Sequence, residues 1–243
     1  MHLAAVRMTT HLNALIGNLI SVEAAARTIV ADDVAHHVLD PDAVLGLDPL
    51  RASELETGLA ALLAAEREGW ALGLPVPGSL LPLRGPRELN EAALEIGQVV
   101  IATTAELALV PYLVGRGVQW RVFSARRPFA VATPYEAERA LNEAVLSAAR
   151  VLSDLDVAAG SRPRASFEAR LAPGYGPRQL ATADRALRLL LACDAALADD
   201  GGSISSFEAG LRSRELRRVR EAASHALCAA CSWVDAADRG VWS

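Results

Sequence analysis

Apolar residues recur at intervals of three and four positions over most of the chain, which is the spacing that collects them on one face of a helix. The clearest run is about His2–Leu39, and its apolar positions are Leu12, Leu15, Leu19, Val22, Ala26 and Ile29. We therefore expect one long first helix. Its near-heptad stripe would form either the central helix of the domain or the seam of a homodimer.

Proline placed directly after a capping residue marks the starts of several further helices. Asp48-Pro49, Gly85-Pro86 and Thr133-Pro134 are examples, and Thr133–Glu136 is also a capping box, as are Ser53–Glu56 and Ser205–Glu208. We predict helices over 49–70, 86–101, 134–155, 177–198 and 205–237, a short helical segment over 41–45, and an extended loop over 74–85.

One segment has a different pattern. Residues 106–127 contain two runs rich in Val, Leu and aromatic residues on either side of Gly115-Arg116-Gly117, which is typical of a β-hairpin. We predict strands over 107–114 and 117–125. The expected fold class is mainly α: a multi-helix, bundle-like single domain over 1–243, with one antiparallel hairpin at about 107–125 and a mobile connection over 158–176.

Residues 97–115 form a 19-residue stretch with one charge, Glu106, so a membrane span has to be considered. An ionised carboxylate at bilayer depth is costly, and Pro111 follows it closely. The end of a buried helix followed by a strand accounts for the same hydropathy. We therefore expect no membrane association.

The composition argues against some classes of function. The net charge is −5 and all 24 basic residues are arginine, which argues against non-specific nucleic-acid binding. Three cysteines, without the spacing of a disulfide framework, indicate reduced thiols and a cytoplasmic location. The first 20 residues do not have the pattern of a signal peptide.

Two groups of residues have partial metal-ligand spacing. Asp32 and His36, like Asp33 and His37, are four residues apart and would share a helix face. The second group is a stripe on the last predicted helix, formed by His225, Cys228, Cys231 and Asp235. Neither helix supplies a complete ligand set by itself. We expect helix-end contacts and core packing there, with no metal and no cofactor.

The favoured ligand site lies at a helix start. Arg84-Gly-Pro-Arg87 ends the proline-rich loop directly at the predicted helix N-terminus, where backbone N–H groups attract anions. The hairpin contributes further arginines and a tryptophan that could frame an apolar pocket with a cationic mouth. The predicted ligand-binding residues are Arg84, Arg87, Asn90, Glu91, Trp120 and Arg121.

The sequence contains no known catalytic motif: Gly-x-Ser-x-Gly, His-Glu-x-x-His and a lysine-containing phosphate loop are all absent. We expect a non-catalytic protein that binds a small anionic ligand or a partner and self-associates. One alternative is an enzyme whose acid and base groups are Glu88, Glu91 and Glu95, which share a face of the helix at 86–101. The other alternative is a structural homo-oligomer built on the first helix.

Overall fold

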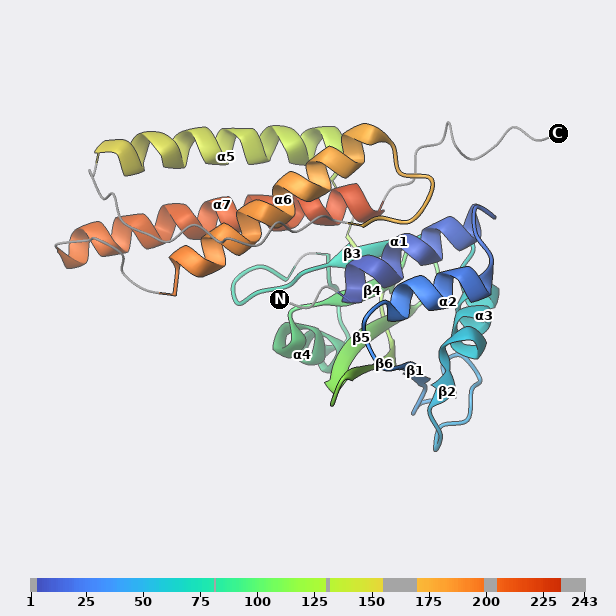
Figure 1. Cartoon of the computed structure of the whole chain (residues 1–243). Helices are drawn as coiled ribbons and strands as arrows, with labels where there is room; N and C mark the ends of the chain where they lie inside the picture. Colours follow the sequence, from blue (N-terminus) through green and yellow to red (C-terminus); the bar gives the residue numbers. More distant parts are fainter. Residues whose placement is uncertain (1–3, 81, 130–131, 155–169, 199–204, 233–243) are drawn as a thin grey trace. The chain divides into compact units, whose positions relative to one another are not determined.

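The computed structural model describes residues 4–80, 82–129, 132–154, 170–198 and 205–232. These residues form two compact units (Figure 1). Of the described residues, the α/β unit contains 4–80, 82–129, 170–176 and 231–232, and the helical unit contains 132–154, 177–198 and 205–230. The sequence analysis had treated 1–243 as one domain.

The α/β unit is built on a single six-stranded sheet in the order β2-β1-β6-β5-β4-β3. Strand β1 pairs with β6 in parallel, and every other neighbouring pair is antiparallel. The strands are β1 His36–Leu39, β2 Ser53–Glu54, β3 Trp70–Gly73, β4 Val99–Ala102, β5 Leu107–Val114 and β6 Gly117–Ser124. The predicted mainly-α bundle with one hairpin is therefore wrong, because the hairpin is the centre of a mixed sheet.

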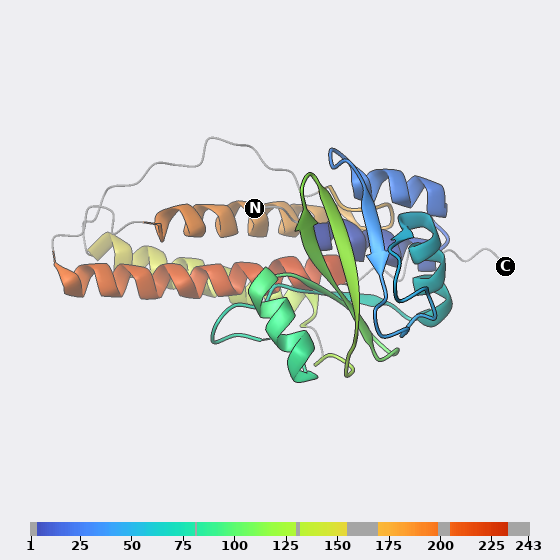
Figure 2. The same cartoon turned by 90° about the horizontal axis from the view of Figure 1, so that it is seen from below.

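Helices cover both faces of this sheet (Figure 2). They are α1 Ala4–Ile16, α2 Val22–Val30, α3 Leu55–Ala65 and α4 Arg87–Ile96. Helix α4 packs on the face that carries Ile101, Val110 and Phe123. Side chains alternate along a strand, so Trp120 points to the opposite face, the face of α1–α3.

The long first helix predicted over 2–39 is also wrong. Helix α1 ends at Ile16, and Asn18 takes a left-handed conformation with φ of 55°. Ser21 then caps α2 through the N–H of Ala24. Residues 36–39 are strand β1. Most of the apolar stripe packs inside the unit: Leu12 and Ile29 are fully buried, and Leu19 and Val22 are half-buried. The stripe is therefore not the exposed seam of one long helix.

Two further predicted helices are too long. The helix expected over 49–70 is only α3, and the one expected over 86–101 ends where Gly97 adopts a φ of 74°. Strands β3 and β4 each replace a predicted helix end. Four-residue apolar runs look alike in a buried strand and a buried helix. The segment over 41–45 is a turn rather than a helix, because the buried Asp40 carboxylate accepts hydrogen bonds from the N–H groups of Val44, Leu45 and Leu47.

The hairpin is confirmed. Strands β5 and β6 pair from Leu107 opposite Ser124 to Val114 opposite Gly117. The hydropathy of residues 97–115 thus belongs to strands β4 and β5 and the turn between them. None of the helices in the described residues has the length and apolar character needed to cross a bilayer.

Close helix–sheet packing depends on one glycine. A Cβ atom at Gly58 of α3 would lie 2.3 Å from Cγ2 of Val38 on β1, well inside van der Waals contact. Gly58 therefore allows α3 to lie directly on β1. Glycine inside a helix costs roughly 0.5–1 kcal/mol relative to alanine, and the close packing that buries Val38 completely offsets this cost.

The outer edge of the sheet at β3 is closed by side chains. The Asn13 amide accepts from the Trp70 N–H at 2.8 Å and donates to the Trp70 carbonyl at 3.0 Å. Its Nδ2 also lies within hydrogen-bond distance of the Tyr175 hydroxyl and the Cys231 carbonyl. The next outward-facing N–H, that of Leu72, donates to Ser232 Oγ at 3.0 Å. An edge that could pair with another chain is thus occupied.

Glu66 ties the end of α3 to the β4–β5 turn. Its carboxylate is buried and accepts from the backbone N–H groups of Glu68, Thr104 and Ala105 and from the Thr104 hydroxyl. Burial by itself raises the pKa of Glu66, but these hydrogen bonds to the charged form outweigh it and hold the pKa below the ordinary value.

The helical unit contains α5 Pro134–Asp154, α6 Pro177–Ala196 and α7 Ser206–Ser232, whose last two residues are counted with the α/β unit. Its core includes Ala144, Ala148, Cys193 and Val219. The predicted capping boxes at Thr133 and Ser205 are present. All three helices were predicted. Residues 197–198 of the second prediction are not helical, and residues 155, 158–169 and 233–237 lie outside the described residues.

Replacing Asn13 by Ala removes both hydrogen bonds to Trp70 and leaves buried backbone groups without partners. We expect the α/β unit to lose about 1–3 kcal/mol of stability. Amide exchange at Trp70 should accelerate in hydrogen-exchange NMR. Thr28→Ala is the control, because Thr28 bonds to the Ala24 carbonyl on the exposed side of α2. Unchanged exchange at Trp70 in the Asn13 variant would show that the edge does not depend on this amide.

Glu66→Gln should destabilise the α/β unit at pH 7 by about 1–3 kcal/mol, since four charge-assisted contacts are weakened. The folded-state pKa of Glu66 lies below the ordinary value of 4.5. Its contribution is therefore complete above pH 4.5 and is lost as the pH falls through the folded-state value. Denaturant titrations at pH 7 and in this acidic range should show a smaller pH effect in the variant. Glu68→Gln, at an exposed neighbouring carboxylate, should leave the wild-type pH dependence in place.

Candidate functional site

The proline-rich loop and the segment after the hairpin lie side by side. The Arg126 N–H donates to the Gly85 carbonyl at 3.0 Å, and the Phe129 N–H donates to the Pro82 carbonyl at 3.1 Å. These two bonds place Arg84 beside the residues that follow β6. The proline-rich loop thus meets the chain just after the hairpin.

The resulting surface, which we call the Arg84 surface, consists of Arg84, Arg126, Arg127 and Phe129. All four residues are exposed. The Arg84 guanidinium carbon lies 5.0 Å above the centre of the Phe129 ring, and Arg127 Nε donates to the Thr104 carbonyl. Within the described part of the chain, none of these arginines forms an ion pair with a carboxylate. Their charge is thus available to a ligand.

The start of α4 borders this surface. Pro86 is the N-cap residue of α4 and provides no side-chain cap. A Cβ atom at the buried Gly85 would lie 3.8 Å from the Arg87 backbone nitrogen and 4.0 Å from Asn90 Nδ2, so both donors lie on the same side of Gly85. This arrangement suits an anion, because hydrogen-bond donors and the helix dipole act together.

Two of the predicted arginines already have carboxylate partners. Arg87 Nε lies 2.6 Å from Glu91 Oε1, and this contact raises the pKa of Arg87. Arg121 lies 3.4 Å from Glu88 and stacks on Phe123. Both pairs are solvent-exposed and therefore weak, but they reduce the charge available to an anion.

Trp120 lies away from the other predicted ligand-binding residues. It is fully buried on the α1–α3 face, whereas Arg121 is on the α4 face. The two are adjacent on β6 and so point in opposite directions. The structure brings Arg84, Arg87, Asn90 and Glu91 together around the start of α4 and leaves Trp120 out.

Trp120 belongs instead to a chain of hydrogen bonds. Its Nε1–H donates to His36 Nδ1 at 3.1 Å, His36 Nε2 lies 2.9 Å from Asp33 Oδ2, and Arg7 lies 2.6 Å from the same oxygen. Indole N–H is only a donor, so Nδ1 is the acceptor and the imidazole proton is on Nε2. With both ring nitrogens engaged, His36 is not free to bind a metal or accept a proton from a substrate.

The expected Asp–His pairs four residues apart are not formed. Asp33 contacts His36, three residues on, and His37 lies 3.7 Å from Glu54 of the neighbouring strand. Strand β1 replaces the predicted helix end and turns successive histidines to opposite faces.

The cysteine stripe of α7 is also part of the packing. Cys228 and Cys231 are buried, and Asp235 lies outside the described residues. The described residues contain no group of three or more His, Cys, Asp or Glu side chains arranged to hold a metal ion. Burial raises the pKa of the third cysteine, Cys193, to about 11, so its thiol is protonated at neutral pH and is a poor nucleophile.

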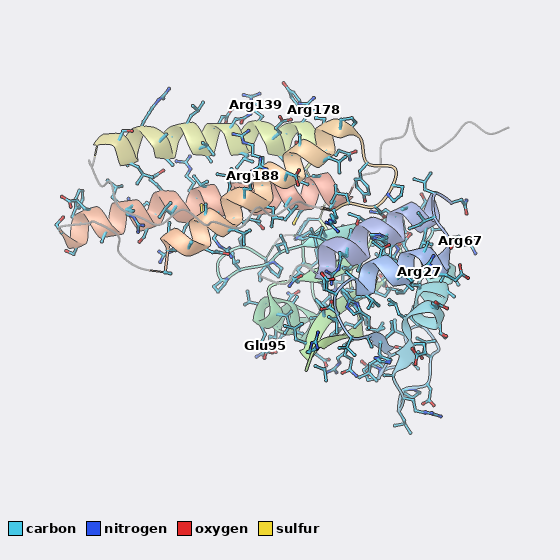
Figure 3. All side chains as sticks on the ribbon, viewed as in Figure 1. Arg27, Arg67, Glu95, Arg139, Arg178 and Arg188 are labelled. Carbon is cyan, nitrogen blue, oxygen red and sulfur yellow. The ribbon has the colours of Figure 1, made fainter. Side chains whose placement is uncertain are left out.

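The carboxylates that would act as acid and base groups if the protein were an enzyme are on the surface. Glu88, Glu91 and Glu95 are all exposed, and Figure 3 shows Glu95 on the outer side of α4. A catalytic acid or base usually acquires a shifted pKa in a desolvated cleft, and this face of α4 provides no such environment.

Sequence analysis missed a groove of about 490 Å³ in the α/β unit. It is bounded by α2, by residues 34–36 and by β2 with the start of α3. Its apolar lining consists of Ala26, Val30, Val34, Ala35 and Leu55, and its charged residues are Arg27, Glu54 and Glu56. The sequence could not show this groove, because it depends on the strand at 36–39 that was assigned to a helix.

Two family models match the chain. One, described as Rv1486c-like protein, N-terminal domain, matches residues 5–136, and the other, Rv1486c-like protein, C-terminal domain, matches residues 135–228. The chain belongs to this family. No curated protein and no solved structure matches the chain significantly. The boundary between the two matches falls close to residue 132, where the helical unit begins.

The hydrogen bond from Trp120 fixes a measurable property of His36. At neutral pH, ¹⁵N NMR of the imidazole should show a neutral ring protonated at Nε2. Trp120→Phe removes the donor and should shift the Nδ1 resonance. Trp70→Phe is the control, because Trp70 Nε1 has no hydrogen-bond partner among the described residues. A ring protonated at Nδ1 in the wild-type protein would contradict this assignment.

Proposed function

We propose that this member of the Rv1486c-like family is a non-catalytic protein that binds a small anionic ligand at the Arg84 surface. The observation that carries the proposal is the Gly85–Arg126 backbone hydrogen bond. It joins two arginine-bearing segments next to a helix start that has no side-chain cap.

The chemistry of this surface favours a phosphate or carboxylate group. Guanidinium groups bind such oxyanions through two parallel hydrogen bonds. The exposed Phe129 ring provides an apolar contact beside them. An anion here would gain charge-assisted hydrogen bonds of about 1.5–3 kcal/mol each.

A catalytic role has less support. The acidic residues of α4 are exposed, His36 has partners at both ring nitrogens, and Cys193 has a raised pKa. These particular candidates for acid–base or nucleophilic steps are therefore engaged, protonated or solvated. Binding requires only the arrangement of donors that is present.

Pyrophosphate titrated into the full chain, followed by calorimetry, tests the proposal. We expect the double variant Arg84→Ala/Arg126→Ala to bind at least about tenfold more weakly, since each lost contact is charge-assisted. Thermal stability should be nearly unchanged, because both side chains are exposed and neither forms an ion pair with another described residue. Arg116→Ala, at the exposed hairpin turn, is the matched control and should bind as the wild type does.

Glu91→Gln gives a test of opposite sign. Glu91 neutralises Arg87, so removing its charge should strengthen pyrophosphate binding. Equal affinity in the wild-type protein, the double variant and Glu91→Gln would rule out anion binding at this surface. A loss in the double variant equal to that in Arg116→Ala would mean non-specific attraction to arginine.

A further inference from the structure

The groove between α2 and α3 carries opposite charges on its two sides. Arg27 projects from α2 (Figure 3), whereas Glu54 and Glu56 come from β2 and the first turn of α3. The same groove has the apolar lining described above. It therefore combines an apolar surface with opposite charges on two different elements.

Few contacts within the protein neutralise these charged side chains. Across the described ranges, Arg27 and Glu56 form no ion pair, and Glu54 has only His37 at 3.7 Å. Arg27 is close enough to Glu23, one helical turn earlier, to lower its pKa slightly, after the larger effects of hydrogen bonds to the Glu23 backbone N–H and Ser21. Both sides can therefore pair with a ligand.

We propose that this groove binds a short zwitterionic peptide with apolar side chains. The peptide carboxylate would pair with Arg27, its ammonium group with Glu54 and Glu56, and its side chains would contact Val30, Val34 and Leu55. A ligand with a single charge would leave one side of the groove without a charged partner, whereas a zwitterion pairs with both sides.

The size of the groove agrees with this ligand. Its volume of about 490 Å³ is in the range of sites that hold drug-sized molecules, roughly 300–1,000 Å³. A dipeptide spans about 7 Å between its residues' ends, given about 3.4 Å per extended residue, and a tripeptide about 10 Å. His36 borders the groove, but its side chain is fully buried and both of its ring nitrogens have partners, so it provides no hydrolytic group.

This site is separate from the Arg84 surface, so the two proposals succeed or fail independently. The probe is the dipeptide Leu-Leu, titrated into the full chain and followed by calorimetry and by amide chemical shifts. We expect saturable binding with shifts at residues 26–36 and 54–56. Two analogues test the two charged ends of the peptide separately. Leu-Leu amide lacks the carboxylate, and N-acetyl-Leu-Leu lacks the ammonium group.

Each variant should affect only the peptides that carry the charged end with which the replaced residue pairs. Arg27→Ala should weaken Leu-Leu binding by roughly fivefold, the upper range for an exposed ion pair, and leave binding of the amide unchanged. Glu54→Gln/Glu56→Gln should weaken Leu-Leu and the amide and leave binding of N-acetyl-Leu-Leu unchanged. Arg67→Ala and Glu68→Gln, exposed beyond the far end of α3, are the controls and should bind all three as the wild type does.

Several results would overturn the proposal. Absence of saturable Leu-Leu binding at millimolar concentration is one. Equal binding of all three peptides is another, because the charged sides would then be irrelevant. Tighter binding of a longer apolar peptide with both ends blocked would identify the groove as a docking surface for a protein segment instead.

Discussion

The architecture of the α/β unit depends on how the outer edge of β3 is satisfied. An amide side chain has the same donor and acceptor as a peptide group, so Asn13 serves as a one-residue strand partner for Trp70. Ser232 provides the next partner, at Leu72. Without them, buried backbone groups would lack hydrogen bonds, at a cost of about 1–3 kcal/mol each. Asn13 belongs to α1, which also contacts β3, so the same helix packs on the sheet and closes its edge.

Buried carboxylates play the equivalent part in the loops. Asp40 organises the turn after β1, and Glu66 joins the end of α3 to the β4–β5 turn. Each accepts several backbone N–H groups, which keeps the charge satisfied without a basic partner. An acidic residue in such a role has no signature in the sequence, because the donors of Glu66 at the turn are 38 and 39 residues away.

The parts of the fold that could be predicted from sequence are those determined locally. The β5–β6 hairpin follows from its glycine-flanked turn, and α5 and α7 follow from capping boxes at Thr133 and Ser205. Strands β1, β3 and β4 have only four residues each, too few for a period to show. Their conformation depends on pairing with distant strands, so helical spacing nearby was extended through them. The groove beside β1 was lost for the same reason.

The candidate anion site contains both a correct and an incorrect prediction within a few residues. Gly85-Pro86 correctly marked the start of α4, and Arg84 with Arg87 lies there. The inclusion of Trp120 with Arg121 conflicted with the strand predicted for them, since neighbouring residues on a strand point to opposite faces. Applying that alternation to the predicted strand would have placed Trp120 in the core and Arg121 beside α4. What no local rule could show is the pairing of residues 82–85 with 126–129, which assembles the arginines, because it depends on the completed sheet.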